Sequence, residues 1–240
     1  MPDLDVTAVM ITGKSPERVP FALASIKAFQ RQTYQRRRLV IINSAPTMLE
    51  YPQEPGDAPV YQFRAEPEKT LGALRNQALD AAYAMEPATH VIQWDDDDWS
   101  HERRIERQVA AAIMTPGAAI TLYRQVRYSF GLKAAIVSVS QPFGIPGTIL
   151  HPPTEQRYEE VPRHEDSRFM QRLLTVVPAR RLSASMYIRF EHGANTWDQR
   201  HIMGRQAIHL AQLQRRRILL PEPDAAYLRQ VLTEHYAWRT

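Results

Sequence analysis

The chain has 240 residues, of which 44% are hydrophobic and 23% are charged, a composition typical of a globular protein rather than a disordered one. It contains no cysteine, which excludes disulfides, thiolate metal sites and a cysteine nucleophile and agrees with a reducing compartment. The formal net charge is +4, and the 30 basic residues include only four lysines; either anion binding or a GC-rich genome produces such an arginine bias.

No segment has the roughly 18 consecutive apolar residues that indicate a membrane-spanning helix. The first residues also lack the basic start and apolar stretch of a secretory signal. We therefore expect a cytoplasmic protein, with peripheral contact at the inner face of a membrane as the closest approach to lipid.

The first half of the sequence alternates between strand-like and helix-like patterns. Continuous apolar runs predict strands at 6–11, 39–42, 60–63 and 90–94. Apolar residues at helical spacing predict helices at 19–29, at 71–85 after the cap Thr70 and before Pro87, and up to Ile113 after the cap Ser100. Strands that alternate with helices indicate right-handed βαβ units and a mostly parallel sheet. Ligands bind beyond the carboxyl ends of such strands, here at 12–14, 43–46 and 95–98.

From Ala118 the pattern changes to shorter, alternating runs. They predict strands at 126–130, 135–139, 148–151 and 185–192, and helices at 165–175, 196–214 and 228–238. Because no internal repeat and no linker separates the two halves, we predict one domain over residues 1–240, with a variable C-terminal half.

Four consecutive aspartates, Asp95–Asp98, form the strongest local signal. Adjacent carboxylates repel one another, so the run requires water or a cation around it. Carboxylate oxygens suit Mg²⁺ or Mn²⁺, with substrate phosphate oxygens completing the coordination shell. The alternative is a solvated acidic turn that caps the helix near Ser100. The position of the run, directly after a buried-type strand, favours the metal site.

Three further residues carry weaker signals. Arg75 lies in the first turns of a helix, where it either holds a phosphate or a nucleotide base or lies on the protein surface. Asp166, beside Glu165, is either a general base for an acceptor hydroxyl or a helix cap. His192 ends the last predicted strand, and a lone histidine in such a place is usually structural.

Together these residues have the order and spacing of a known family: the chain resembles the family 2 glycosyltransferases, which have the GT-A fold. The segments that carry the resemblance are Ile11-Thr12-Gly13, Ser25-Ile26, Gln32-Thr33-Tyr34, Leu71-Gly72-Ala73-Leu74-Arg75-Asn76, Gln93–Trp99, Glu165-Asp166, Tyr187-Ile188-Arg189 and His192–Trp197. The fourth is similar to the family's helix with an A-R-N element, the fifth to its D-x-D motif and the sixth to its E-D motif. The resemblance covers residues 5–115 well and 145–200 loosely.

The resemblance implies an α/β fold, a GT-A-like three-layer αβα sandwich whose sheet is mostly parallel with an antiparallel C-terminal part. Residues from about 1 to 117 would bind the nucleotide sugar, residues from about 118 to 200 the acceptor, and residues from about 201 to 240 would form a helical tail. The implied activity is a metal-dependent, inverting transfer from a nucleoside-diphosphate sugar to an acceptor hydroxyl. The implied partners are a glycan or lipid-linked acceptor in bacterial surface-glycan assembly, and no nucleic acid.

The roles of single residues follow from the same resemblance. Asp166 would be the catalytic base, with Glu165 beside it. The residues implied at the nucleotide sugar are Thr12, Gly13, Asn43, Arg75, Asp95 and Asp96. Asp97 would ligate Mn²⁺ or Mg²⁺, and His192 would contact the metal or the diphosphate. The absence of cysteine leaves carboxylates and His192 as ligands, which points to such hard metals.

The sequence departs from the family in two places. The second strand ends in Asn43 and Ser44, where the family usually has an acidic residue that reads the base; an amide can still hydrogen-bond a base edge. The Q-x-x-R-W element of processive synthases is absent, since the run Gln214-Arg215-Arg216-Arg217 continues into Ile218.

Two alternative functions remain at this stage. A nucleotidyltransferase would show a glycine-rich loop after the first strand, where Thr12–Ser15 contains a single glycine. A non-catalytic module for a nucleotide sugar or a nucleic acid would use the arginine clusters at 36–38, 180–181 and 215–217 along a phosphate backbone. The acidic run at the expected ligand edge would repel a nucleic acid.

Overall fold

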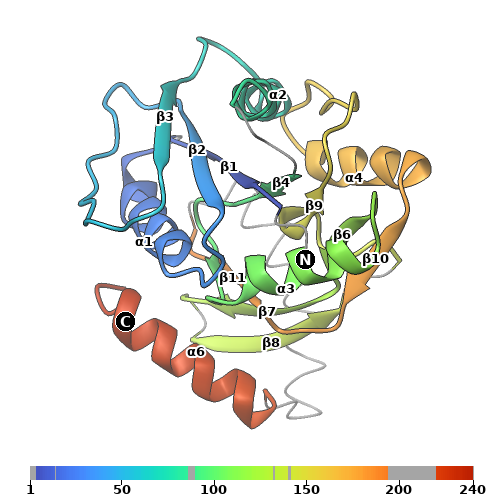
Figure 1. The fold of residues 1–240 in the computed structure, drawn as a ribbon. Helices are drawn as coiled ribbons and strands as arrows, with labels where there is room; N and C mark the ends of the chain where they lie inside the picture. The colour runs from blue at the N-terminus through green and yellow to red at the C-terminus, as the bar shows by residue number, and fades with distance from the viewer. Residues whose placement is uncertain are drawn as a thin grey trace.

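The computed structural model describes residues 4–13, 15–85, 90–131, 133–139, 142–193 and 220–239. The predicted helix at 196–214, Pro87 and the arginine cluster at 215–217 lie outside the described residues. Within the described part of the chain, every helix is too short or too polar to span a bilayer. Figure 1 shows two sheets, with helices packed around the larger one.

Seven strands form the larger sheet, in the order β10-β6-β9-β4-β1-β2-β3. Their bounds are β1 (Val6–Thr12), β2 (Arg37–Asn43), β3 (Val60–Arg64), β4 (His90–Gln93), β6 (Ala119–Leu122), β9 (Leu150–His151) and β10 (Ala179–Leu182). β1 pairs in parallel with both β2 and β4, whereas β9 runs antiparallel to β4 and β6. Both faces of β1 and β2 are covered, which explains their continuous apolar runs. The predicted mostly parallel sheet is confirmed.

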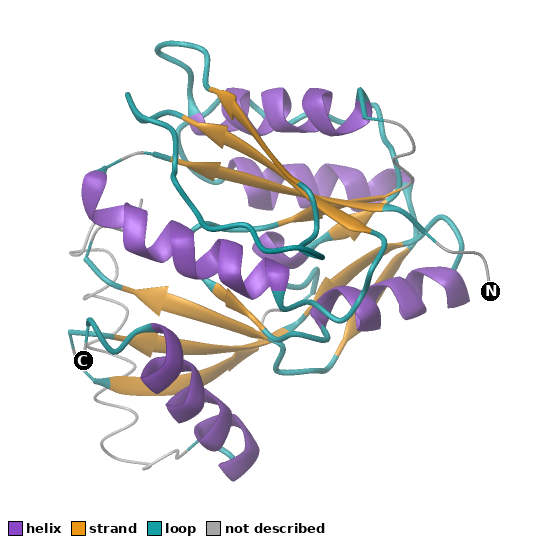
Figure 2. Ribbon diagram, turned by 60° about the vertical axis from the view of Figure 1, so that its left-hand side comes forward, coloured by secondary structure: helices purple, strands orange, loops and turns teal. Residues whose placement is uncertain are grey.

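Helices cover both faces of this sheet (Figure 2). Their bounds are α1 (Val19–Gln30), α2 (Leu71–Tyr83), α3 (Arg104–Met114) and α4 (Glu165–Val176), with 3₁₀ turns η1 (Pro16–Arg18) and η2 (Pro146–Thr148). α1 and α3 share one hydrophobic core with Met10, and α2 and α4 share the other with Val9. Successive strand residues point to opposite faces, so neighbouring residues of β1 anchor the two helical layers. The α/β sandwich expected from the sequence is confirmed.

A second sheet, in the order β5-β11-β7-β8, lies below the first in Figure 1. Its strands are β5 (Trp99–Ser100), β7 (Arg124–Ser129), β8 (Ala134–Val139) and β11 (Tyr187–Glu191), and α6 (Glu222–His235) packs against it. β7 and β8 are antiparallel, as are β5 and β11, which confirms the antiparallel C-terminal part. The sequence did not predict that these strands leave the main sheet, and α6 begins earlier than the predicted helix at 228–238.

The two predicted helix caps have different outcomes. The hydroxyl of Thr70 accepts from the backbone N–H of Ala73 at 3.3 Å, so this cap is confirmed. The prediction for Ser100 is wrong, because its backbone pairs with Tyr187 in the second sheet and α3 begins only at Arg104. The Ser100 hydroxyl instead accepts from the Arg104 guanidinium at 2.8 Å.

Candidate active site

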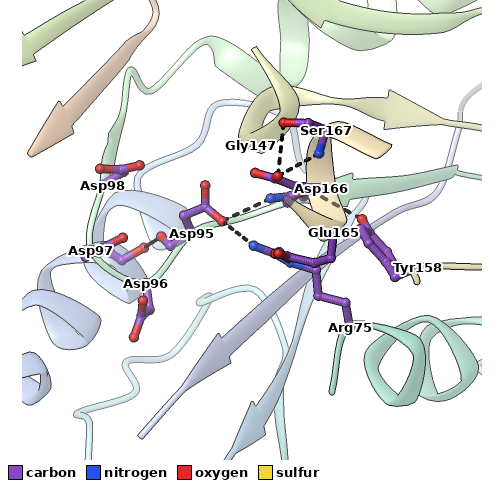
Figure 3. A network of polar contacts seen from close by, with 12 residues as sticks. Arg75, Asp95, Asp96, Asp97, Asp98, Gly147, Tyr158, Glu165, Asp166 and Ser167 are labelled. Carbon is purple, nitrogen blue, oxygen red and sulfur yellow. Dashed lines mark hydrogen bonds and ion pairs between the residues drawn. The ribbon is translucent and has the colours of Figure 1, made fainter. Parts of the chain in front are cut away.

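An open cleft lies at the carboxyl ends of β1 and β4. It brings together Arg75 of α2, the run Asp95–Asp98, and Glu165 and Asp166 of α4. Figure 3 shows these side chains in one polar network. Residues that the sequence separates widely therefore meet at the sheet edge where ligands are expected in parallel α/β folds.

The aspartate run is not a solvated turn. All four aspartates line the cleft, but Asp96 and Asp98 are only 3% and 6% exposed, whereas Asp95 and Asp97 are partly buried. The carboxylate of Asp98 accepts from the backbone N–H of Phe190 at 2.9 Å and contacts the Tyr187 hydroxyl. Burial, together with the neighbouring aspartates, raises the pKa of Asp98 well above its ordinary value. The alternative of a solvent-exposed helix cap is therefore wrong.

Tyr187 joins the two ends of the aspartate run. Its hydroxyl lies 2.9 Å from Asp95 Oδ2 and also contacts Asp98. Burial and the adjacent carboxylates raise the pKa of this phenol, which keeps the hydroxyl protonated as a donor. A Cβ atom at Gly147 would lie 2.2 Å from Asp95 Oδ2 and 2.9 Å from the Tyr187 hydroxyl, so only glycine leaves room for this contact.

Arg18, which the sequence reasoning missed, lies against the middle of the run. Its guanidinium pairs with Asp96 and lies 3.0 Å from Asp97 Oδ2, with only 8% of the side chain exposed. Burial alone would raise the pKa of Asp97, but Arg18, His192 and Arg189 outweigh this effect and lower it. The available signal was an arginine in a proline-led turn just beyond the first strand, at the predicted ligand edge.

Arg75 links the aspartate run to α4. Its Nε donates to Glu165 Oε1 at 2.9 Å and its Nη2 donates to Asp95 Oδ1 at 3.3 Å. The guanidinium also lies over the ring of Tyr158, 5.7 Å from its centroid. Arg75 is buried, so the alternative of a surface arginine is wrong. Asn76 holds the loop that carries Tyr158, because its side chain exchanges hydrogen bonds of 3.0 and 2.7 Å with the backbone of Tyr158.

The two acidic residues at the start of α4 have different surroundings. Glu165 is buried against Arg75, and burial raises its pKa in spite of that partner. Asp166 lies on the wall of the cleft, where its Oδ1 accepts from the N–H and the hydroxyl of Ser167 at 2.6 and 3.2 Å. The N-cap of α4 is His164, in a left-handed conformation with φ 64°, so Asp166 is not the helix cap. Both acids line the cleft, and Asp166 is the more exposed of the two.

Arg104 supports the floor of the cleft from below. It is fully buried, and its Nη2 donates to the carbonyls of Gln93 and Gly147 at 2.9 and 3.1 Å. Burial lowers the pKa of this guanidinium to about 10. The side chain thereby ties the end of β4 to η2 and fixes the backbone on both sides of Asp95.

Three predicted nucleotide-binding residues lie outside the cleft wall. The hydroxyl of Thr12 is hydrogen-bonded to Asp96. Gly13 has φ 92°, and a Cβ atom there would lie 2.3 Å from both Ala45 N and Asn43 Oδ1. The buried Asn43 amide donates to Gln62 Oε1 at 2.8 Å and accepts from Ala45 N at 2.8 Å, so it shapes the loop after β2. Contact with a nucleotide stays a prediction for Thr12, Gly13 and Asn43.

Asp97 and His192, the two metal ligands that the sequence predicts, lie in contact with each other. His192 Nε2 lies 3.3 Å from Asp97 Oδ2, and its ring stacks on Phe21 with centroids 4.0 Å apart. Among the described residues, no group of three or more histidine, aspartate or glutamate side chains could hold a metal. Asp97 Oδ2 also lies 3.0 Å from Arg18 Nη2, and the side chain of His192 is fully buried and absent from the cleft wall. Metal binding by this pair stays a prediction.

No protein-family model and no curated protein matches the sequence. Solved structures do match the fold. The structure of S. aureus TarS 1-349 in complex with UDP-GlcNAc is similar with a TM-score of 0.61 and 12% identity, covering 80% of this chain and 60% of that chain. The TarS 1-349 complex with UDP has a TM-score of 0.57 and 13% identity, and the match covers 79% of this chain and 61% of that chain. A further TarS structure has a TM-score of 0.59 and 12% identity, and the match covers 78% of this chain and 37% of that chain.

This chain therefore spans less than two thirds of the length of these TarS structures. At such low identity the similarity shows the fold and nothing finer. It agrees with the mixed α/β, GT-A-like arrangement of the two sheets and confirms the fold class expected from the sequence.

Proposed function

We propose that this protein is an inverting glycosyltransferase that moves a sugar from a nucleoside-diphosphate sugar to an acceptor hydroxyl. The observation that carries the proposal is the convergence of Asp166 with the run Asp95–Asp98 in one cleft at the carboxyl ends of the strands. The shared fold with TarS, whose structures contain UDP and UDP-GlcNAc, supports a nucleotide sugar as the ligand. Uridine is therefore the first nucleotide to test.

The donor would lie along the first half of the chain. Its proposed contacts are Thr12, Gly13, Asn43, Arg75, Asp95 and Asp96. The acceptor would enter from the second half, from about residue 118 to 200, which supplies Asp166. Support for this division comes from the cleft wall, to which both Asp95 and Asp166 contribute.

Asp97 and His192 would hold Mn²⁺ or Mg²⁺ against the diphosphate. When bound, the ion supplies positive charge that stabilises the departing diphosphate. Support for the pair comes from the 3.3 Å distance between His192 Nε2 and Asp97 Oδ2. Arg18 and Arg189 add further positive charge on the cleft wall, where a diphosphate would carry negative charge.

Asp166 would act as the base of a single displacement. Its carboxylate takes the proton from the acceptor hydroxyl while that oxygen forms a bond to the anomeric carbon. The bond from this carbon to the diphosphate oxygen breaks, and the diphosphate leaves with the electron pair, so the configuration inverts. A well-placed base contributes about 10²–10⁴-fold to the rate. Glu165, held by Arg75, would keep the first turn of α4 in place beside the base.

A glycan or lipid-linked acceptor, in bacterial surface-glycan assembly at the inner face of a membrane, completes the proposal and rests on the family resemblance of the motifs. The nucleic-acid alternative has little support from the cluster at 36–38. Arg36 pairs with Asp5 at 2.5 Å, Arg37 is buried, and Arg38 bonds to the Thr7 hydroxyl at 2.9 Å, so these side chains serve the fold.

A thermal-shift panel of UDP, GDP, CDP and dTDP, each with and without Mn²⁺, tests the proposal. We expect stabilisation that requires both the metal and one nucleotide. The absence of a shift with all four nucleotides would contradict the proposed donor class, and equal shifts with and without Mn²⁺ would contradict metal dependence. Release of nucleoside diphosphate from the matching nucleotide sugar would then report transfer directly.

A further inference from the structure

Asp95, the first carboxylate of the run, is held by three donors from different segments of the chain. Arg75 and Gln93 donate to Asp95 Oδ1 at 3.3 and 3.1 Å, and the Tyr187 hydroxyl lies 2.9 Å from Oδ2. Figure 3 shows Arg75 reaching this carboxylate. Because both oxygens have donors, these side chains decide which way the carboxylate faces in the cleft.

Two of the three donors are shared with other carboxylates. The Arg75 guanidinium also donates to Glu165 at 2.9 Å, a shorter contact than the one to Asp95. The Tyr187 hydroxyl has one proton and contacts Asp98 as well as Asp95. Among the described residues, the Nε2 of Gln93 donates to Asp95 alone. Gln93 is therefore the donor that serves only this carboxylate.

Tyr158 fixes the orientation of the Gln93 amide. Its hydroxyl donates to Gln93 Oε1 at 3.3 Å, and burial raises the pKa of this phenol, so the hydroxyl keeps its proton. The NH₂ group of the amide then faces Asp95, whereas the reverse orientation would set two acceptor oxygens against each other. The Tyr158 ring is itself held in place, since it stacks on Phe169 with centroids 4.1 Å apart.

Gln93 lies behind the cleft. It is the last residue of β4 and only 1% exposed, and it is not part of the cleft wall. Asp95 and Tyr158 accept from and donate to its amide, and of these two Asp95 is the one that lines the cleft. An effect of the Gln93 side chain on a ligand must therefore pass through Asp95.

We propose that Gln93 is a positioning residue that turns the Asp95 carboxylate toward the nucleotide sugar, with Tyr158 setting the direction of its amide. This inference rests on the proposed function, in which Asp95 contacts the donor. Loss of a hydrogen bond to a charged group corresponds to about 10–100-fold in an equilibrium constant. A misdirected Asp95 should therefore weaken donor binding while the proposed base, Asp166, stays in place.

The test replaces Gln93 with glutamate, which keeps an acceptor for Tyr158 but sets a second carboxylate against Asp95. Affinity for UDP, or for whichever of GDP, CDP and dTDP binds in its place, is measured by titration calorimetry in one buffer. For Gln93→Glu we expect it to fall about tenfold or more, and in steady-state transfer the donor KM should rise with little change in kcat. The matched control is Gln30→Glu, which should keep the wild-type affinity. The Gln30 amide exchanges hydrogen bonds of 2.9 Å with the backbone of Ala58, before β3 and at the sheet edge opposite the cleft.

Two further variants separate positioning from general packing. In an Asp95→Asn background, Gln93→Glu should have no further effect on nucleotide affinity, because the carboxylate through which it acts is gone. Tyr158→Phe keeps the ring on Phe169 but frees the amide, so it should weaken nucleotide binding in the same direction and by less.

The outcomes distinguish this inference from the proposed function. Wild-type nucleotide affinity in Gln93→Glu would overturn the inference while the proposed function stands. An equal loss with and without Asp95→Asn would also overturn it, since the damage would then not act through Asp95. If Gln93→Glu does not fold, as its melting curve will show, unchanged affinity in Tyr158→Phe overturns the inference instead. A wild-type chain that binds none of the four nucleotides would overturn both.

Discussion

Arg75 donates to Glu165 at 2.9 Å and so joins the first turns of α2 and α4 at the bottom of the cleft. The same guanidinium reaches Asp95 at 3.3 Å, so it compensates two carboxylates at once. Burial opposes its charge, but these carboxylates more than offset burial and raise the pKa of Arg75. Arg75 and Glu165 therefore stabilise the packing of the two helices as well as lining the cleft.

Arg75→Ala should therefore destabilise the protein strongly. Removing one member of a buried pair leaves an uncompensated charge and typically costs about 3–5 kcal/mol. Urea unfolding should show this loss, and the double variant with Glu165→Gln should recover part of it because it removes that charge. The control Arg157→Ala breaks an exposed pair with Asp80 and should cost at most about 1 kcal/mol. Equal effects of the two arginine variants would refute a supporting role for Arg75.

Asp166→Asn should reduce sugar transfer by about 10²–10⁴-fold, because the amide cannot take the acceptor proton. Binding of UDP with Mn²⁺ should be nearly unchanged, since Asp166 would act on the acceptor side. Steady-state kinetics and calorimetry together measure the two effects. Asp80→Asn, a change at an exposed residue of α2, is the matched control. Full activity in Asp166→Asn would eliminate this residue as the base.

The sequence predicted the features that depend on local pattern. The apolar runs of β1 and β2, the cap at Thr70 and the run Asp95–Asp98 at a strand end all follow from periodicity and from where parallel strands end. The cleft contains Arg75 and Asp166 for the same reason, since both lie in the first two turns of helices that begin at this edge.

The features of the site that the sequence did not predict depend on contacts between segments that lie far apart in the chain. Arg18 reaches Asp96 and Asp97 only because η1 folds over the end of β1, and Tyr187 reaches Asp95 only because β11 pairs with β5 in the second sheet. Helical spacing also predicts on which face of its helix Arg75 lies, but it does not predict which segment of the chain packs over that face. The loop at Tyr158, held by Asn76, makes that arginine buried rather than exposed.

Stability should fall in acid because of His151, a fully buried histidine of β9. Burial lowers its pKa to about 4, from an ordinary value of 6.5. Between these values the unfolded chain binds a proton that the folded chain does not. The contribution of the neutral, buried His151 to the free energy of unfolding is therefore complete above about pH 6.5 and is lost as the pH falls toward 4. The shift corresponds to roughly 3 kcal/mol. Denaturant unfolding from pH 4 to 8 should show this slope, and His151→Gln should flatten it; an unchanged slope in that variant would assign it to other groups.

Gly147→Ala should impair the site without unfolding the protein. A methyl group there would lie 2.2 Å from Asp95 Oδ2 and 2.9 Å from the Tyr187 hydroxyl, so the contact between Asp95 and Tyr187 must open. Because Asp95 is a proposed donor contact, we expect weaker binding of UDP with Mn²⁺ and slower transfer. Gly131→Ala is the matched control, since a methyl group there meets nothing within 4 Å. Calorimetry should separate the two variants; equal UDP affinity in both would mean that the carboxylate of Asp95 does not contact the nucleotide.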